Sequence, residues 1–286
     1  MSFLHAIVLG IVQGLTEFLP ISSSGHLVIV PWLFGWNDFE TMSTARAIAT
    51  ARAFDTALHL GTLAAVLIYL RKDLIVYVAQ GSQIIFNRKQ PATQAGRRAW
   101  FLVLSALPAG IVGAAFEDKI TEKLGSPALI SVSLIIFGVV LIWADRRATA
   151  KNYLQTIESL TMRNALVIGA AQVLALNPGT SRSGITITAA RLSGYSRDAA
   201  ARLSFLMSVP IIAGAVLFKL AKLVTDGIPD GLLMPMLVGI VVAGISGWLA
   251  MWSMIRLVQT KTFAPYVFYR CIVGAGVLIA VASNWR

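Results

Sequence analysis

A group of side chains that could do chemistry interrupts the first apolar segment of the chain, between Gln13 and His26. The interruption contains an amide, a carboxylate, three consecutive serine hydroxyls and an imidazole, and apolar residues flank it on both sides. Placing a charge at the centre of a membrane helix costs about 2.5–3.5 kcal/mol on insertion scales, so ionisable residues at that depth usually face a cavity and act there. We therefore expect the chemistry of this protein in the stretch 13–26.

A second polar interruption, Asn-Pro-Gly-Thr-Ser-Arg-Ser-Gly at 177–184, breaks an apolar segment in the second half of the chain. An arginine in a turn rich in glycine and serine is suited to hold a phosphate through two parallel hydrogen bonds. Unpaired N–H groups and the helix dipole also favour an anion at a helix N-terminus. If the two interruptions meet in space, the converging polar residues are Glu17, Ser22, Ser23, Ser24, His26, Thr180, Ser181, Arg182, Ser183 and Thr186.

This converging set indicates phosphoryl transfer from an anionic substrate at a membrane. A serine with a histidine nearby supplies a nucleophile and a proton shuttle. Gln13 lies four residues before Glu17 on one helical face, so the two side chains could hold a hard divalent cation through oxygen. Simpler interpretations stay open: Glu17 as a structural ion-pair partner of Arg182, the serines as helix-packing residues, and His26 as a hydrogen-bonded buried histidine.

The composition is that of a membrane protein. Hydrophobic residues make up 57% of the 286 residues and charged residues only 13%, and the mean hydropathy is +0.75. These values are typical of polytopic membrane proteins. The net charge of +11 lies mainly in short links between apolar runs, the pattern of loops that face anionic lipid, so nucleic-acid binding is disfavoured. The single cysteine, Cys271, can form no intrachain disulfide.

Short apolar segments must position the two interruptions. Residues 3–19 and 24–36 are each shorter than the roughly 20 residues needed to cross a bilayer, which predicts a re-entrant helical hairpin around Pro20. The same arrangement recurs around the second interruption, from residue 164 to Leu192. Three spans are predicted after each hairpin, at 53–70, 99–116, 128–143, 203–222, 232–255 and 264–283, with a helix lying on the membrane around Leu74–Phe86.

The order of one hairpin and three spans occurs twice, which predicts a single membrane domain, 1–286, made of two halves, approximately 1–145 and 160–286. Basic residues concentrate in three of the connecting loops, which should face the cytoplasm and leave both termini outside. Three spans between equivalent points give the halves opposite orientations. We therefore predict an all-α polytopic fold of six transmembrane helices and two re-entrant hairpins in an inverted-topology repeat, whose broken helices meet near the midplane.

The two interruptions, read as Gln-Gly-Leu-Thr-Glu-Phe-Leu-Pro-Ile-Ser-Ser-Ser-Gly-His and Pro-Gly-Thr-Ser-Arg-Ser-Gly, resemble motifs of the undecaprenyl-pyrophosphate phosphatases, the bacterial bacitracin-resistance family of integral membrane enzymes. The resemblance covers nearly the whole chain, including the stretches 54–62 and 203–210. It implies an active site open to the periplasmic side of the bacterial inner membrane, and dependence on a divalent cation such as Mg²⁺ or Ca²⁺.

The resemblance also assigns residues. The family's first motif begins with Glu or Gln and has Glu four residues later, matching Gln13 and Glu17 as metal ligands. With Glu17, we expect Ser23 as the nucleophile, His26 as general base and acid, and Arg182 as the diphosphate clamp; direct attack by His26 or by activated water is the alternative. The expected substrate-binding residues are Ser22, Ser24, Gly25, Thr180, Ser181, Ser183 and Thr186.

The reaction that the resemblance implies is hydrolysis of undecaprenyl diphosphate to undecaprenyl phosphate and phosphate, which recycles the lipid carrier of cell-wall precursors and confers bacitracin resistance through the shared substrate. The main rival is a polyprenyl-phosphate transporter or flippase, because inverted repeats with broken helices are the usual architecture of secondary carriers. A second rival is a non-catalytic protein that binds the lipid or shields it from bacitracin. The expected partners are this lipid and the bilayer, and a homodimer is compatible with the sequence.

Overall fold

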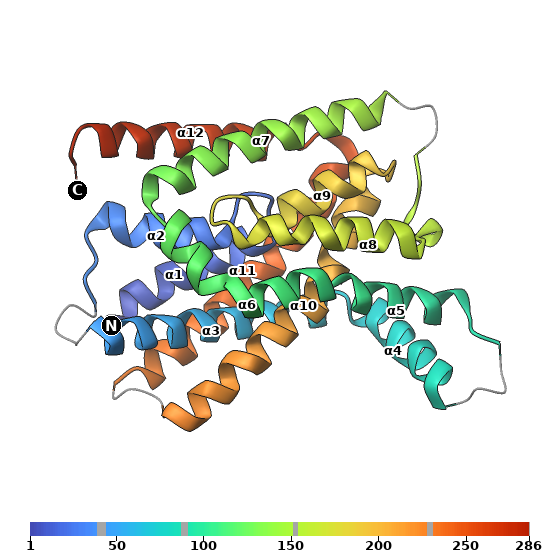
Figure 1. Cartoon of the computed structure of the whole chain (residues 1–286), viewed down its shortest axis with the longest axis horizontal. Helices are drawn as coiled ribbons and strands as arrows, with labels where there is room; N and C mark the ends of the chain where they lie inside the picture. Colours follow the sequence, from blue (N-terminus) through green and yellow to red (C-terminus); the bar gives the residue numbers. More distant parts are fainter. Residues whose placement is uncertain (39–43, 87–90, 151–153, 228–230, 286) are drawn as a thin grey trace.

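The computed structural model describes residues 1–38, 44–86, 91–150, 154–227 and 231–285 (Figure 1). Helices dominate the described part, and no β-strand occurs in it. The α-helices are α1 (Phe3–Phe18), α2 (Ser23–Phe34), α3 (Thr44–Tyr69), α4 (Arg71–Phe86), α5 (Gln94–Ser105), α6 (Leu107–Leu124), α7 (Pro127–Thr149), α8 (Met162–Ala171), α9 (Arg182–Leu192), α10 (Arg197–Asp226), α11 (Leu233–Thr260) and α12 (Ala264–Ala282). Two short 3₁₀ helices, η1 (Ile157–Ser159) and η2 (Gln172–Leu176), precede and follow α8.

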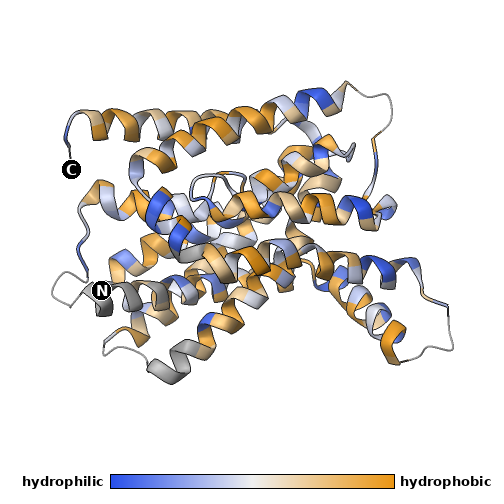
Figure 2. Cartoon of the chain, in the orientation of Figure 1, coloured by the Kyte–Doolittle hydropathy of each residue, from blue (hydrophilic) through white to orange (hydrophobic). Residues whose placement is uncertain are grey.

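Five helical segments within the described residues are long and apolar enough to cross a membrane, and the bent pair Ala53–Tyr69 and Arg71–Phe86 would add a sixth if it is one span. Apolar residues run along most of these helices (Figure 2). The predicted all-α polytopic membrane fold is therefore confirmed. The predicted helix around Leu74–Phe86 is also present, as α4, whose axis turns 84° away from the preceding segment Ala53–Tyr69.

Both predicted hairpins consist of short helices. Helix α1 has 16 residues and α2 has 12, and the turn containing Pro20 separates them. In the second half, α8 and η2 lead into the turn before α9, which has 11 residues. In Figure 1 the two termini lie at the same end of the molecule, as the predicted orientation requires. The division into two inverted halves stays a prediction.

Helix α1 is held tightly against α11, because small residues line the contact. A Cβ added to Gly14 would collide with the Ser246 side chain and with the α11 backbone at Ala243 and Gly247. Small residues at such contacts let two helix backbones approach closely. The position of α1, and with it the position of Glu17 one turn later, therefore depends on Gly14.

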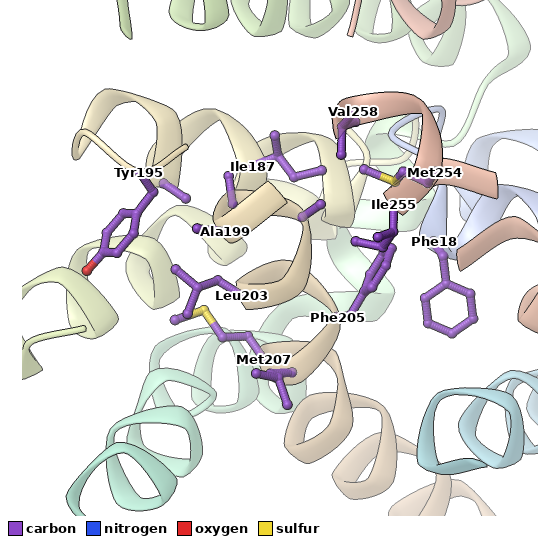
Figure 3. Packing of buried hydrophobic residues seen from close by; sticks show 14 of the residues in the cluster. Phe18, Ile187, Tyr195, Ala199, Leu203, Phe205, Met207, Met254, Ile255 and Val258 are labelled. Carbon is purple, nitrogen blue, oxygen red and sulfur yellow. The ribbon is translucent and has the colours of Figure 1, made fainter. Parts of the chain in front are cut away.

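The main hydrophobic core surrounds α10, which lies between α9, α11 and the end of α1 (Figure 3). Phe18 and Phe205 are both fully buried there, and their rings meet edge to face with centroids 5.7 Å apart. Aromatic pairs of this geometry contribute about 0.5–1.5 kcal/mol beyond their buried area. Because Phe18 is the next residue after Glu17, this contact anchors the carboxylate-bearing end of α1 in the core.

A buried ionic cluster fixes the far end of α9. The Arg191 side chain is fully buried, and its Nε donates to Asp145 Oδ1 of α7 at 2.9 Å. Arg197, at the start of α10, bonds the same carboxylate oxygen at 2.9 Å. The cluster therefore joins α7, α9 and α10 at the end of α9 opposite to Arg182.

Candidate active site

The two polar interruptions form tight turns at the starts of α2 and α9. Ser22 is the N-cap of α2, and its hydroxyl accepts the Gly25 N–H at 3.4 Å. Ser181 caps α9 in the same way and accepts the Gly184 N–H at 3.0 Å. The φ angles of the two serines are +77° and +75°, a conformation that is strained for residues other than glycine. Such strain is concentrated at functional sites.

The two turns are bonded to each other. The Gly179 N–H donates to Ser22 Oγ at 3.1 Å, and Ser183 Oγ donates to the Leu19 carbonyl at 2.8 Å. Gly25 permits this approach, since a Cβ at that position would lie 3.3 Å from the Gly179 nitrogen. The structure thus brings together the two interruptions that the sequence predicts to converge.

The centre of the site is the buried carboxylate of Glu17, which is 5% exposed. Its Oε2 accepts a short hydrogen bond from Ser23 Oγ, at 2.6 Å, and a second from Gln13 Nε2, at 3.2 Å. Its Oε1 lies 3.3 Å from an Arg182 guanidinium nitrogen. A hydroxyl bonded to a carboxylate has a proton acceptor in place for nucleophilic attack.

Arg182 holds its position through backbone carbonyls as well as through the carboxylate. Its two terminal nitrogens donate to the carbonyls of Ser204, at 3.1 Å, and of Glu17, at 3.3 Å. Its Nε is buried without a hydrogen-bond partner among the described residues. The ion pair with Glu17 agrees with the structural interpretation of that residue. Arg182 is also the first residue of α9, and its contacts with Glu17 join the start of α9 to the end of α1.

His26 is turned away from Ser23. Its Nδ1 lies 2.7 Å from the Ser22 carbonyl and its Nε2 lies 3.0 Å from the Tyr269 hydroxyl. A carbonyl can only accept, so Nδ1 carries a proton; in a neutral ring Nε2 would then accept from the Tyr269 hydroxyl. In the described part of the chain no hydrogen bond joins His26 to Ser23, and the partner of the serine is Glu17 instead.

The remaining predicted site residues surround this centre. The Thr186 hydroxyl bonds Ser204 Oγ at 2.7 Å, and the Thr180 hydroxyl accepts from Asn177 at 3.2 Å. Ser24 is exposed, with its hydroxyl 3.5 Å from Ser22 Oγ. Buried hydroxyls of the set therefore hold the turns in shape, whereas Ser23 and Ser24 are accessible. The buried members are Ser22, Thr180, Ser181, Ser183 and Thr186.

Three residues near the site have no place in the sequence-based set. His59 of α3 lies with its Nε2 3.9 Å from Glu17 Oε2, while its Nδ1 bonds the Asp55 carbonyl at 2.7 Å. Tyr269 and Arg270 of α12 contact His26 and the two turns, respectively. Arg270 had a readable signal, because an arginine inside a predicted span is a candidate functional residue. His59, an ionisable residue inside the predicted span 53–70, had the same signal, although its contact with Glu17 depends on how α3 packs against α1.

The oxygen atoms around Glu17 suit a hard divalent cation. Gln13 is fully buried, and its Oε1 has no hydrogen-bond partner among the described residues, although its Nε2 is bonded to Glu17. Amide and carboxylate oxygens are the ligands that Mg²⁺ and Ca²⁺ prefer. The described residues contain no group of three His, Cys, Asp or Glu side chains that could hold a metal, so a cation here would depend on substrate oxygens for further ligands.

Comparison with known proteins finds relatives of the whole chain. The family model described as bacitracin resistance protein BacA matches residues 6–276. The undecaprenyl-diphosphatase of Geobacter metallireducens is 43% identical over 286 residues, which cover 99% of this chain and 100% of the relative. That of Pelobacter propionicus is 43% identical over 285 residues, 99% of either chain. That of Desulforudis audaxviator is 44% identical over 276 residues, 96% of either chain.

Proposed function

The chain belongs to the bacitracin resistance protein BacA family and is an undecaprenyl-diphosphatase, and from that premise we propose how its two turns hydrolyse the lipid diphosphate. The observation that carries the mechanism is the 2.6 Å hydrogen bond from Ser23 Oγ to a carboxylate that also faces Arg182. It supports the proposal because it joins the proposed nucleophile to the proposed proton acceptor, with the proposed phosphate-binding cation in contact with the same carboxylate.

In the proposed reaction, Ser23 Oγ attacks the terminal phosphorus of the lipid diphosphate and transfers its proton to Glu17 Oε2. The bond between that phosphorus and the bridging oxygen breaks, and undecaprenyl phosphate leaves. Water then attacks the phosphoserine and the bond between phosphorus and Ser23 Oγ breaks; Glu17 returns its proton to that oxygen, and inorganic phosphate leaves with the protons of the water. Glu17 takes the role of base that the sequence analysis assigned to His26, since the carboxylate and not the imidazole contacts the serine.

Arg182 and the starts of α2 and α9 would hold the diphosphate. The guanidinium and the unpaired N–H groups of a helix N-terminus both favour an anion. Because these donors are already fixed by the turns, they can stabilise the charge that develops on the phosphoryl oxygens without reorganising. His26 bonds the Ser22 carbonyl and the Tyr269 hydroxyl, and so ties the turn before α2 to α12.

A divalent cation, Mg²⁺ or Ca²⁺, would be held by Glu17 and by the unpartnered Gln13 Oε1. When bound, it would offset negative charge on the phosphoryl oxygens as a Lewis acid. The proposed mechanism assigns binding and proton transfer to the residues of the chain themselves.

We place the multi-pass protein in the bacterial inner membrane with the site open to the periplasmic side, on the basis of the basic loops at the opposite end of the spans. Bacitracin resistance would follow because the enzyme and the antibiotic compete for one lipid. A homodimer stays a prediction of the sequence and has no part in the mechanism.

The test is release of inorganic phosphate from undecaprenyl diphosphate by the purified protein in detergent, with and without added Mg²⁺ or Ca²⁺. Arg182→Met should reduce kcat/KM strongly, because the diphosphate loses its cation. A protein that only carries the lipid would release no phosphate, and that result would refute the mechanism.

A further inference from the structure

Arg270 lies in α12 and is fully buried. Within the described part of the chain its guanidinium donates to five backbone carbonyls and to no side chain. These carbonyls are Leu134 at 2.9 Å, Pro20 at 3.2 Å, Ser133 at 3.4 Å, Gly179 at 2.9 Å and Thr180 at 3.1 Å. Nε bonds Leu134, one terminal nitrogen bonds Pro20, and the other terminal nitrogen bonds the remaining three carbonyls, so that at least one of its two N–H groups is shared. The planar fork of an arginine can reach such a set, and the point charge of a lysine cannot.

Three of these carbonyls belong to the two turns of the active site. Pro20 lies in the turn between α1 and α2, and Gly179 and Thr180 lie in the turn before α9. Buried carbonyls outside regular helices need a partner, since leaving one unpaired is strongly destabilising. Arg270 therefore supplies the hydrogen bonds that let both turns exist at this depth, and it joins them to each other through one rigid group.

The bond to Thr180 also sets the direction of a backbone amide. The described peptide bonds include no cis bond, so the Ser181 N–H points to the side opposite from the Thr180 carbonyl. Since that carbonyl faces Arg270, the Ser181 N–H faces away from it, at the start of α9. The geometry of the donors around the proposed diphosphate position thus depends on Arg270, although the guanidinium itself is turned toward carbonyls.

The buried charge of Arg270 also points to a role in the reaction. No carboxylate of a described residue lies within ion-pair distance of it, whereas Arg182 faces Glu17 and Arg191 faces Asp145. A buried charge without a counter-charge is expensive. An anionic diphosphate bound next to the turns would offset that cost.

We propose that Arg270 is a positioning residue for phosphoryl transfer: it holds the two turns in register so that Ser23, Arg182 and the N-termini of α2 and α9 meet around one phosphoryl group. The proposal rests on the proposed function of the site. It assigns Arg270 to the geometry of the transition state and not to direct binding of phosphate.

The experiment compares Arg270→Met with Arg191→Met. The second variant removes an equally buried arginine, which lies at the C-terminal end of α9, away from the turn that precedes this helix. We would measure kcat and KM for phosphate release by the folded fraction, together with inhibition by vanadate, a mimic of the transferring phosphoryl group, and by inorganic phosphate. A misplacement of reacting groups by about 1 Å costs about a hundredfold in rate. Arg270→Met should lose kcat by that order, and its vanadate inhibition should weaken at least about tenfold more than its phosphate inhibition.

Arg191→Met should lower the thermal midpoint but keep both the kcat of the folded fraction and the ratio of the two inhibition constants. The proposal is overturned if Arg270→Met keeps wild-type kcat, if vanadate and phosphate weaken equally, or if Arg191→Met shifts the ratio in the same way. Where Arg270→Met is not recovered folded, Arg270→Lys takes its place, with an expected kcat loss of at least about tenfold and the same selective loss of vanadate inhibition. Absence of phosphate release by the wild type would instead refute the function of the site.

Discussion

The Ser22 hydroxyl joins the two turns. Replacing Ser22 by alanine or by glycine should lower both the stability of the protein and its kcat, and the two variants should differ in stability alone. Either replacement removes the acceptor of two buried N–H groups, those of Gly179 at 3.1 Å and Gly25 at 3.4 Å. An unpaired buried N–H costs about 1–3 kcal/mol, so the loss should be about 2–4 kcal/mol, given that the second bond is long. Both variants should therefore unfold at a lower temperature than the wild type.

The two variants should differ from each other because of the backbone. Alanine keeps the strain of the positive φ, +77°, whereas glycine removes it. Relief of such strain is worth about 1–3 kcal/mol, and the extra freedom of glycine in the unfolded chain takes back about 0.4–1 kcal/mol. Ser22→Gly should thus be more stable than Ser22→Ala by about 0.5–2 kcal/mol, yet equally impaired in kcat, since neither restores the hydrogen bond from Gly179 to residue 22.

The assays are thermal unfolding in detergent and phosphate release by the folded fraction. Ser126→Ala serves as the control, because Ser126 caps α7 through its hydroxyl at an ordinary φ of −69°. It should lose about 0.5–2 kcal/mol and keep its activity. A midpoint of Ser22→Gly below that of Ser22→Ala would refute the strain argument, and wild-type kcat in either variant would refute a role of the Gly179–Ser22 hydrogen bond in aligning the turns.

Three further predictions concern the carboxylate, the cation and the packing of α1. Glu17→Gln keeps the size of the side chain but removes the proton acceptor of Ser23, so kcat should fall by about 10²–10⁴; a pre-steady-state assay that finds the chemical step unchanged would contradict this. Gln13→Leu removes the unpartnered oxygen, so the Mg²⁺ concentration needed for half-maximal activity after chelator treatment should rise severalfold; an unchanged requirement, measured by Mg²⁺ titration, would exclude Gln13 as a ligand. Gly14→Ala forces a methyl group into the α11 backbone and should destabilise the protein by about 1–3 kcal/mol and lower kcat with it; Gly276→Ala is the control, since no atom lies within 4 Å of a Cβ at that position.

Much of the architecture could be predicted from the sequence, because the length and hydropathy of an apolar segment indicate a membrane helix. The short apolar segments on either side of Pro20 correspond to α1 and α2, and the turn before α9 lies where the second polar interruption predicts it. The ends of the helices were less predictable than the apolar spans: the span predicted from residue 53 is present as Ala53–Tyr69, but the helix that contains it, α3, begins at Thr44. Helix propensity extends through the polar residues there, which a hydropathy argument ignores.

The contacts within the site were harder to predict. The expected hydrogen bond between Ser23 and His26 does not form. His26 lies four residues after Ser22, and its ring bonds the backbone carbonyl of Ser22 instead. The acceptor for Ser23 is instead Glu17, across the turn at Pro20, and turn geometry is not readable from spacing alone. Contacts with His59 and Arg270 depend on the packing of α3 and α12 against the turns, which a single sequence does not encode in any local pattern.

The most direct test of the central claim is the kcat of phosphate release by Ser23→Ala, measured beside Ser253→Ala, whose hydroxyl bonds the Ala250 carbonyl within α11. If Ser23 attacks the phosphorus, its replacement should lower kcat by at least about a thousandfold, as loss of a nucleophile does in other enzymes, while the control keeps wild-type activity. A folded Ser23→Ala protein that retains kcat within about tenfold of the wild type would contradict the mechanism.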